Sequence, residues 1–360
     1  MSDVSTALPP EALYPAGALR PPYAMIDVRS PIEVARGALP GAHALPLMSD
    51  AERHQVGVCY AEAGQEAALA LGWEITRPHL PARVAAWRDV AAQGPTAVVC
   101  WRGGLRSALV QQLIDRPDVQ AVAGGYKAVR RYLTSALPSA LDRASLLVLT
   151  GLTGSGKTAL LQRLTTGSAL HVLDLERLAH HRGSSFGATE EAQPPQASFE
   201  HAIASHLLLH RARFVLVEDE SRYVGRRTLP PELLAAMQRA PLALLEATLD
   251  ERVARVFDEY VRVPAEHHGV AVARAGLEAG VLRLRRRLGG RRTSAVLAGL
   301  ARAEPAWFDP DAHRAWIVLL LQEYYDRLYE RNRAALGRPV QLRGDAAALA
   351  AALSDLAAGR

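Results

Sequence analysis

The stretch Leu146-Leu-Val-Leu-Thr-Gly-Leu-Thr-Gly-Ser-Gly-Lys-Thr158 decides the fold of the second half of the chain. It opens with an apolar run typical of a buried strand, and the part from Gly151 onward fits the spacing G-x-x-x-x-G-K-[ST] in full. In this motif the glycines let backbone N–H groups turn inward around a phosphate, and the following helix adds the partial positive charge of its amino terminus. The spacing therefore predicts a phosphate-binding loop with a magnesium ligand at Thr158, made of Gly151, Thr153, Gly154, Ser155, Gly156, Lys157 and Thr158.

Acidic residues follow two other apolar runs of this half. Phe214-Val-Leu-Val-Glu-Asp-Glu220 ends in carboxylates, of which Glu218 or Asp219 could hold magnesium through water. Asp174 follows the apolar run 170–173, and open α/β sheets bind ligands at the carboxyl ends of their strands. The spacing does not choose between Glu218 and Asp219, and an acidic loop after a core strand is the alternative interpretation.

Strands alternating with helices are expected along the whole chain. Runs typical of strands lie at 23–27, 97–100, 146–149, 170–173, 214–217, 242–245 and 340–342. This alternation predicts an α/β fold with a mostly parallel sheet covered on both faces. The length of 360 residues exceeds the usual span of one domain, and proline with small polar residues predicts a linker at 137–142. We therefore expect two domains, 1–138 and 139–360, the second ending in a helical region.

The stretch Cys100-Trp-Arg-Gly-Gly-Leu-Arg-Ser107 follows a predicted strand and precedes a predicted helix at 107–114. This arrangement points backbone N–H groups and a helix amino terminus at the sulfur, and both favour the thiolate. Arg102 and Arg106 lie nearby in the sequence and add positive charge. The predicted catalytic residues are therefore Cys100, Arg102 and Arg106, with the cysteine as nucleophile or chalcogen carrier. A buried structural cysteine before a glycine-rich turn is the alternative.

The only other cysteine, Cys59, lies in the apolar stretch Gln55-Val-Gly-Val-Cys-Tyr60 and is expected in the core. Two cysteines do not make a disulfide scaffold, and no spacing of cysteine and histidine indicates zinc. The Cys-x5-Arg spacing is also that of cysteine-dependent phosphatases, and the loop is longer than is usual in single-domain sulfurtransferases. We therefore expect a pocket wide enough for a tetrahedral oxyanion, either a phosphoester or an inorganic chalcogenophosphate.

Further motifs resemble those of known families. A resemblance to rhodanese domains rests on Asp27-Val-Arg-Ser-Pro-Ile-Glu33, Gly37-Ala-Leu-Pro-Gly-Ala-His43 and Gly124-Gly-Tyr-Lys-Ala-Val-Arg130. With the two loops, other motifs resemble those of bacterial tRNA 2-selenouridine synthases: Glu52-Arg-His-Gln-Val-Gly57, Asp174-Leu-Glu-Arg-Leu-Ala-His-His-Arg-Gly-Ser-Ser-Phe-Gly187, Phe199-Glu200, Val217-Glu-Asp-Glu-Ser221 and Tyr324-Tyr-Asp326. The resemblance covers residues 23–330 and implies a rhodanese-like domain followed by a P-loop NTPase-like domain.

The resemblance also implies an activity. Members of this family replace sulfur by selenium in the wobble 2-thiouridine of tRNA, using selenophosphate, and are associated with an S-geranylated intermediate made from geranyl diphosphate. It implies these two co-substrates, a tRNA partner and a selenophosphate-producing enzyme. Whether the P-loop takes ATP or a prenyl diphosphate, with or without magnesium, is open. The alternatives are a sulfurtransferase–ATPase or kinase fusion, and a cysteine-dependent phosphatase with an NTP-binding module.

The densest basic stretch is Val281-Leu-Arg-Leu-Arg-Arg-Arg-Leu-Gly-Gly-Arg-Arg292. At helical spacing Leu284 and Leu288 form an apolar stripe, and a Gly-Gly stop follows. The predicted tRNA contacts are Arg283, Arg286, Arg287, Arg291 and Arg292. A second candidate segment is His180-His-Arg-Gly-Ser-Ser-Phe-Gly187, and Trp101 either stacks on the target base or packs under its loop.

Composition limits the location of the protein. The formal net charge is only +5, but nearly all of the positive charge is arginine, which suits bidentate phosphate contacts. No apolar run reaches the ~20 residues that a membrane span needs. The amino terminus has neither the basic region nor the apolar core of a secretory signal. We therefore expect a cytoplasmic protein without a membrane partner.

Overall fold

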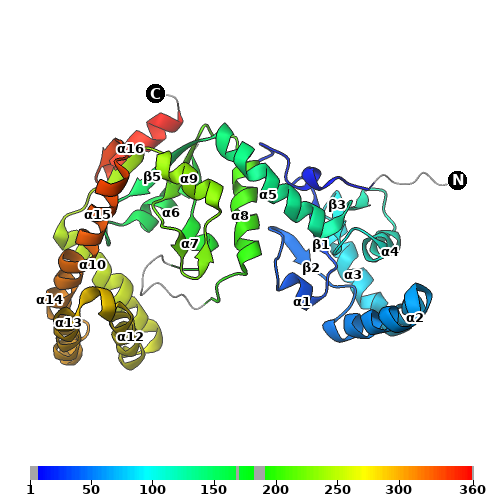
Figure 1. Ribbon diagram of the computed structural model, residues 1–360, viewed down its shortest axis with the longest axis horizontal. Coiled ribbons are helices and arrows are strands. Elements are labelled where there is room, and N and C mark those ends of the chain that lie inside the picture. Colours follow the sequence, from blue (N-terminus) through cyan, green and yellow to red (C-terminus); the bar gives the residue numbers. More distant parts are fainter. Residues whose placement is uncertain (1–6, 168–169, 182–190, 359–360) are drawn as a thin grey trace. The chain divides into compact units, whose positions relative to one another are not determined.

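The computed structural model describes residues 7–167, 170–181 and 191–358, and of 166–167 and 332–336 the backbone alone. The chain forms two compact units (Figure 1). The first unit consists of residues 1–140 and 194–211, and the second of residues 141–193 and 212–360. Both units are built on parallel sheets, as the alternation of strands and helices predicts.

A four-stranded parallel sheet of order β2-β1-β3-β4 forms the centre of the first unit. Its strands are β1 (Ala24–Asp27), β2 (Ala42–Ala44), β3 (Thr96–Val99) and β4 (Val119–Ala121). The sheet carries η1 (Pro10–Leu13), α1 (Pro31–Val34), α2 (Asp50–Thr76), η2 (Arg77–His79), α3 (Leu80–Ala91), α4 (Leu105–Ile114) and α5 (Gly125–Arg143). Every residue of β3 is buried, as expected of a strand in a sheet covered on both faces.

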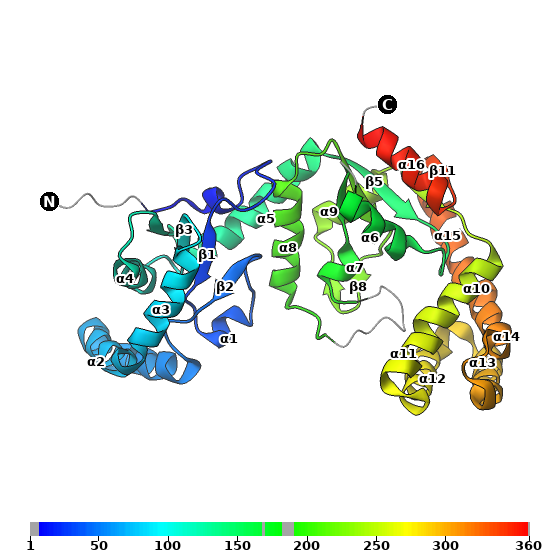
Figure 2. The same ribbon diagram turned by 180° about the vertical axis from the view of Figure 1, so that it is seen from behind.

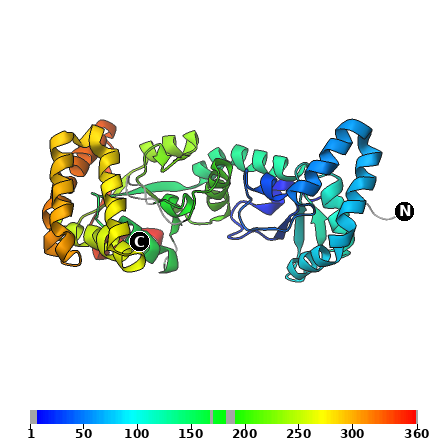
Figure 3. The same cartoon turned by 90° about the horizontal axis from the view of Figure 1, so that it is seen from below.

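Helix α2 is bent into two rods (Figure 3), because Gly64 takes a φ of 85° in its middle. Cys59 lies on this helix and is half-buried, so the prediction that it belongs to the core is wrong. The apolar residues around it do not form one buried stripe. Val58 is 40% exposed and Tyr60 is 59% exposed.

The predicted linker at 137–142 is also wrong, because these residues belong to α5. Proline inside a helix removes one backbone hydrogen bond and usually bends the helix. Here Pro138 faces solvent, and an apolar stripe continues past it through Leu133, Leu137 and Leu141, which are buried. Burial of this stripe outweighs the lost hydrogen bond, so the helix continues to Arg143.

Helix α8 (Gln196–Leu209) packs within the first unit, although strands of the second unit precede and follow it in the sequence (Figure 2). Its mean hydropathy is high, and half or more of its residues are buried, which suits a helix enclosed by other elements. Helices α8 and α5 both come close to the backbone at Gly37. A Cβ there would lie 2.3 Å from Tyr126 Oη and 2.9 Å from Ala197 Cβ.

A five-stranded parallel sheet of order β11-β10-β5-β7-β6 forms the centre of the second unit. Its strands are β5 (Ser145–Thr150), β6 (His171–Leu173), β7 (Phe214–Glu218), β10 (Leu242–Leu245) and β11 (Val340–Gly344), and each lies at or within a residue or two of its predicted range. The helices around it are α6 (Lys157–Gly167), α7 (Leu175–Leu178), α9 (Pro231–Arg239) and α16 (Ala346–Ala357), and a short hairpin joins β8 (Tyr223–Val224) to β9 (Arg227–Thr228).

The rest of the second unit is a helical subdomain with its own core (Figure 3). It consists of α10 (Leu249–Phe257), η3 (Asp258–Arg262), α11 (Val263–His268), α12 (Val270–Leu288), α13 (Gly290–Ala303), η4 (Glu304–Ala306), α14 (Pro310–Leu320), η5 (Leu321–Asp326) and α15 (Arg327–Leu336). The segments η3 and η5 are π-helical. The predicted stop after α12 is present at Gly289, with φ 85°, and α13 begins directly after it.

The contact at Gly37 makes a stability prediction. We expect Gly37→Ala to destabilise the first unit by about 1–3 kcal/mol, because Tyr126 and Ala197 are both buried and cannot move aside freely. Gly57→Ala, in an exposed part of α2 with nothing within 4 Å, is the matched control and should be neutral or stabilising. Hydrogen exchange of the β1 and β3 amides measures this; equal protection in both variants would contradict the close contact.

Candidate active sites: a cysteine loop and a glycine-rich loop

Cys100 follows β3 and begins the cysteine loop (residues 100–107). Its side chain is buried, Sγ accepts a hydrogen bond from Gly104 N–H at 3.3 Å, and Ser107 Oγ lies 3.2 Å from Sγ. Burial raises the pKa of the Cys100 thiol, but hydrogen bonds from Ser107 and from the N–H groups of Gly104 and Arg102 outweigh it. The net effect lowers the pKa, so the loop favours the thiolate, as the strand–loop–helix pattern predicts.

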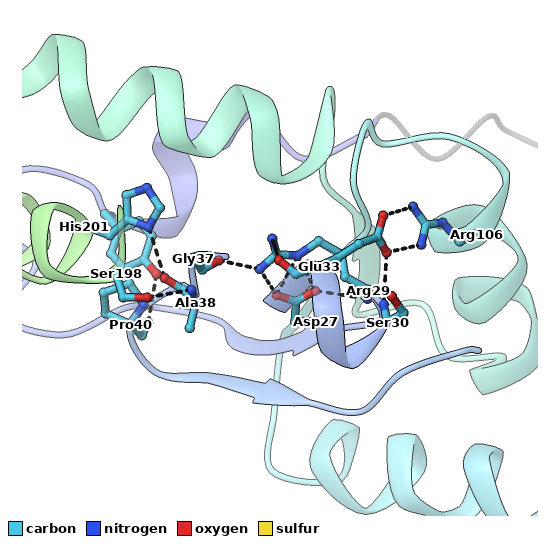
Figure 4. A network of polar contacts seen from close by, with 11 residues as sticks. Asp27, Arg29, Ser30, Glu33, Gly37, Ala38, Pro40, Arg106, Ser198 and His201 are labelled. Carbon is cyan, nitrogen blue, oxygen red and sulfur yellow. Dashed lines mark hydrogen bonds and ion pairs between the residues drawn. The ribbon is translucent and has the colours of Figure 1, made fainter. Parts of the chain in front are cut away.

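Arg106 is held by a carboxylate (Figure 4). Its Nη1 and Nη2 donate to Glu33 at 2.6 and 3.1 Å, and Glu33 also accepts the N–H of Ser30 at the start of α1. Burial raises the pKa of Glu33, but the hydrogen bonds and charge of Arg106 lower it to about 2. The Arg102 side chain is exposed and makes no hydrogen bond or ion pair with the part of the chain described. The structure therefore fixes only one of the two predicted arginines beside the loop.

A buried arginine lies beneath the cysteine loop. Arg29 Nη2 donates to Asp27 at 2.6 Å and to Gly37 O at 2.8 Å, and its guanidinium lies 3.7 Å from the centre of the Tyr126 ring. Trp101 stacks on the same Tyr126 ring at 5.3 Å between ring centres, and His201 meets that ring edge-on at 5.7 Å. Trp101 therefore packs on the protein, and Tyr126 in turn donates its N–H to Cys100 O at 2.8 Å.

The polar network extends from Arg29 to helix α8 (Figure 4). Ala38 donates its N–H to Ser198 Oγ at 2.9 Å, and its carbonyl lies 3.0 Å from His201 Nδ1. Since a carbonyl only accepts, Nδ1 carries a hydrogen in this contact. Burial lowers the pKa of His201 and so favours its neutral form. Ser198 and His201 of α8 thus bind the N–H and the carbonyl of Ala38. Arg29 binds the carbonyl of the residue before it, Gly37.

The glycine-rich loop (residues 151–158) connects β5 to α6. Gly154 and Gly156 have φ of 79° and 92°, which favour glycine. Helix α10 clamps the outer side of this loop: Arg252 Nε donates to Thr153 O at 2.8 Å, and Arg255 Nη1 donates to Ser155 O at 2.9 Å. Arg252 also forms a fork with Asp326 at 2.6 and 3.1 Å. The arginines bind loop carbonyls and so fix the orientation of its peptide groups.

Carboxylates surround Lys157, whose Nζ donates to Gly151 O at 2.8 Å. Burial lowers the pKa of Lys157, and Glu176, Glu220 and Glu218 oppose this shift. Burial raises the pKa of Glu176 to about 7, and burial with the charge of Glu176 raises that of Glu220 to about 8. Burial raises the pKa of Glu218 well above its ordinary value. These groups therefore form a crowded acidic cluster around a single lysine.

The two predicted magnesium carboxylates have different partners. Asp219 accepts hydrogen bonds from Thr150 at 2.5 Å and from Arg338 at 2.8 Å, so it is already in an ion pair. Glu218 Oε2 accepts Glu176 N–H at 2.9 Å, whereas its Oε1 is buried and has no hydrogen-bond partner within the described chain. Glu218 therefore suits a bound cation better than Asp219.

Two further predicted residues lie beside this cluster. Thr158 Oγ1 donates to Glu176 at 3.2 Å, and Asp174 caps α7 by accepting Arg177 N–H at 2.8 Å. Within residues 7–167, 170–181 and 191–358, no group of three or more His, Cys, Asp or Glu side chains is arranged to hold a metal. His180 and His181 end the α7 region, and the remainder of that predicted segment, 182–187, lies outside the described residues.

The predicted tRNA-binding arginines lie on α12 and α13. Arg283, Arg286, Arg287 and Arg291 are exposed and Arg292 is half-buried, while Leu284 and Leu288 are buried, as the helical spacing predicts. A cavity of about 670 Å³ brings some of them together with residues of η5 and α15. We call it the arginine cleft, and it is lined by Arg287, Arg292, Glu323, Tyr324, Arg327, Leu328, Glu330 and Arg331.

One glutamate occupies the centre of the arginine cleft. Glu323 Oε2 lies 2.8 Å from Arg292 and 2.7 Å from Arg327. It therefore binds two guanidinium groups with one carboxylate oxygen, in the way that a phosphate oxygen does. Arg327 and Arg331 come from a helix that the sequence analysis did not single out.

Sequence analysis missed the residues that hold the two loops in place. Glu33 was noted only as part of a motif, although Ser30 and Glu33 have the spacing of a capping box, which the structure confirms. Arg252 and Arg255 are spaced i, i+3 on a helix after an apolar strand, and that spacing puts them on one face. The spacing indicates that Arg252 and Arg255 can bind the same neighbouring segment, but it does not identify that segment.

The fold and the two loops define a class: an α/β protein with a cysteine-containing loop after a strand of one parallel sheet and a glycine-rich G-x-x-x-x-G-K-[ST] loop after a strand of another. A family model described as the tRNA 2-selenouridine synthase AAA domain matches residues 144–359. No helix in the described ranges is long and apolar enough to cross a membrane.

Curated relatives extend this match to both units. A protein of Cupriavidus necator is 45% identical over 91% of this chain and 92% of its own length. Proteins of Hahella chejuensis and Bordetella bronchiseptica are each 42% identical, over 90% and 89% of this chain and 89% and 91% of their own. All three are named tRNA 2-selenouridine synthase. The chain belongs to the tRNA 2-selenouridine synthase family.

The geometry at Cys100 predicts the effect of one hydroxyl. We expect Ser107→Ala to raise the pKa of Cys100, because the thiolate loses a donor while its burial is unchanged. Alkylation of Cys100 by iodoacetamide, followed by mass spectrometry against pH in a Cys59→Ser background, should show the midpoint moving to higher pH. Ser139→Ala, whose Oγ donates only to Ala136 O, is the control. An unchanged midpoint would show that backbone N–H groups alone hold the thiolate.

Proposed function

We propose that this protein replaces the sulfur of wobble 2-thiouridine in tRNA by selenium from selenophosphate, through an S-geranylated intermediate made from geranyl diphosphate. The names of its relatives support the tRNA and selenium parts. The observation that carries the proposal is the presence in one chain of two separate loops suited to anions, one with a buried cysteine whose pKa is lowered and one with a lysine. We assign the first unit, residues 1–140 and 194–211, to a rhodanese-like domain and the second unit, residues 141–193 and 212–360, to a P-loop domain. We expect the enzyme in the cytoplasm, with a selenophosphate-producing enzyme as supplier.

We assign the alkylation step to the glycine-rich loop. The sulfur of 2-thiouridine forms a bond to C1 of geranyl diphosphate, the C1–O bond breaks, and diphosphate leaves with the electron pair. The N3 proton of the base is released to water. Lys157 and the loop N–H groups bind the diphosphate and stabilise the negative charge that develops on it. Magnesium fits this loop, because Thr158 offers a hydroxyl and Glu218 an unpaired oxygen that can hold a metal-bound water. When bound, it would neutralise charge on the leaving diphosphate.

We assign the exchange step to the cysteine loop. S-alkylation turns a poor leaving group into a good one, so the selenium of selenophosphate can bond to C2 while the C2–S bond breaks. Geranylthiolate leaves with the electron pair and takes up a proton from water. The phosphorus–selenium bond must then break. A thiolate at Cys100 can take up the phosphoryl group, which water removes as phosphate. The donors around Sγ, with Arg106 beside them, suit a tetrahedral oxyanion.

Separate loss of the two steps tests this assignment. Mass spectrometry of tRNA nucleosides after incubation with both co-substrates should show selenium at the former thiouridine. We expect Lys157→Ala to abolish geranylation, and Cys100→Ala to leave geranylation intact while the selenouridine no longer forms. Cys59→Ala is the control for the cysteine, because Cys59 lies on α2, far along the chain from the loop.

The outcomes separate the alternatives. If Cys100→Ala abolished geranylation while Lys157→Ala left it intact, the assignment of steps to loops would be wrong. If neither selenium nor geranyl reached the base, the proposed function would fail. ATP hydrolysis stimulated by tRNA would then favour a sulfurtransferase–kinase fusion, and Cys100-dependent turnover of a simple phosphoester would favour a phosphatase.

We further propose that the arginine cleft and the adjoining faces of α12 and α13 bind the tRNA backbone, through Arg283, Arg286 and Arg287 of α12 and Arg291 and Arg292 of α13. The support is geometric, because four arginines line one cavity and Glu323 holds two of them as a phosphate would. In this interpretation Glu323 competes with tRNA for the same guanidinium groups. It keeps the arginines oriented and weakens binding of anions that make few contacts.

This competition predicts a gain of affinity. We expect Glu323→Gln to tighten tRNA binding by roughly 3- to 10-fold at low salt and to steepen its salt dependence. The reason is that Arg292 and Arg327 no longer pair with a carboxylate and can bind phosphate instead. Glu278→Gln removes the same charge from an ion pair with Arg274 on α12 and is the matched control. Filter binding or fluorescence anisotropy across a salt series measures both. Equal gains in the two variants would show only a general charge effect, and the cleft would then not be the binding site.

A further inference from the structure

An apolar pocket lies directly beside the glycine-rich loop. Thr153 of the loop forms one end of it, and side chains of the helical subdomain form the rest: Val256, Tyr260, Leu277, Trp316, Ile317, Leu320, Leu321 and Tyr325. Apart from a few hydroxyl groups its lining is carbon. A site next to the loop that is predicted to bind phosphate thus leads into a space that excludes charge.

The pocket runs away from the loop along α10. Arg252, which binds Thr153 O, is followed by Val256 and Tyr260 at i+4 and i+8 on the same face. At 1.5 Å per residue, Tyr260 lies roughly 12 Å along the helix from the residue that holds the loop. Helix α12, which contributes Leu277, packs against η3, the segment that contains Tyr260. Tyr260 and Leu277 therefore form the end of the pocket that is far from Thr153.

Both described π-helical segments border this pocket. The segment η3 contributes Tyr260, and η5 contributes Leu321 and Tyr325. Single π-helical turns are rare and are found mostly at functional sites, because they widen a helix and redirect its side chains. Two of them on one pocket indicate that its shape has been set at the expense of regular helix geometry.

An unpaired hydroxyl points to a ligand. Tyr325 Oη is buried and has no hydrogen-bond partner among the described residues. Burial raises the pKa of Tyr325, so the group keeps its proton and remains a donor. The next residue, Asp326, forms the fork with Arg252 that holds Thr153. A ligand that passes from the loop into the pocket would therefore pass the residues on which the loop depends.

We propose that this pocket holds the hydrocarbon chain of an allylic diphosphate whose diphosphate lies in the glycine-rich loop, and that Tyr260 and Leu277 set the chain length accepted. The inference rests on the proposed function, and it adds where the chain binds and which residues select it. The free space is about 30 Å³, room for about one water molecule, so the whole hydrocarbon chain, and not only an added isoprene unit, must displace side chains of this apolar lining.

Direct binding tests the pocket without the reaction. We expect calorimetry on the full chain to show geranyl diphosphate binding at least roughly 100-fold more tightly than inorganic diphosphate, because only the former buries carbon. Dimethylallyl diphosphate should lie between them. Equal affinity for inorganic and geranyl diphosphate would overturn the pocket while leaving the loop as a diphosphate site. Failure of all three to bind would instead refute the proposed function of the loop.

Variants of one helix test the chain-length residues. Leu277→Trp fills the far end and should weaken geranyl diphosphate by roughly 10-fold or more without changing inorganic diphosphate. Leu282→Trp, on the same helix at a side chain that is 52% exposed, is the matched control and should change neither. Leu277→Ala should improve farnesyl relative to geranyl diphosphate, and it carries the test if circular dichroism shows that Leu277→Trp does not fold. An unchanged preference in Leu277→Ala would overturn the assignment of chain length to this end.

Discussion

The buried fork between Arg252 and Asp326 is the interaction on which the second unit depends. The same guanidinium holds Thr153 O, so one side chain joins the glycine-rich loop, α10 and η5. A buried charge that loses its partner destabilises a fold by about 3–5 kcal/mol, so replacing either Arg252 or Asp326 alone is costly. A shift of the helical subdomain would therefore also move the glycine-rich loop. The apolar pocket lies between these same elements, so its shape and the position of the loop are set together.

The cysteine loop is also held in position by contacts from other parts of the chain. Cys100 Sγ accepts a hydrogen bond from the Gly104 N–H and lies 3.2 Å from the Ser107 hydroxyl, while the nearby Arg106 donates to Glu33. Because Glu33 holds one edge of the Arg106 guanidinium, the side chain keeps a fixed position beside the sulfur. Pairing also limits how strongly Arg106 attracts the thiolate. A thiolate that is stabilised mainly by hydrogen bonds stays nucleophilic without being neutralised by a direct ion pair.

Sequence predicted what short-range patterns decide and missed what long-range pairing decides. Both loops and the strands that carry them were predicted, since a glycine-rich loop between strand and helix is a local pattern. The partners of the loops lie far away in the chain: Arg106 and Glu33 are 73 residues apart, and Arg252 and Asp326 are 74 apart. No spacing rule reaches so far. Pro138 was misjudged for the same reason, because burial of Leu133 and Leu141 against the rest of the first unit overrides its local preference.

Charge balance links the acidic cluster to the ligand that we propose. Lys157 is the one lysine near Glu176, Glu218 and Glu220. Burial raises the pKa of all three carboxyls, and the negative charge of neighbouring carboxylates raises it further. A diphosphate alone would add further negative charge. A divalent cation between the diphosphate and Glu218 would offset both, and the carboxyls could then ionise. We therefore expect a diphosphate to enter this site together with a divalent cation, since the carboxylates and the diphosphate would otherwise repel one another.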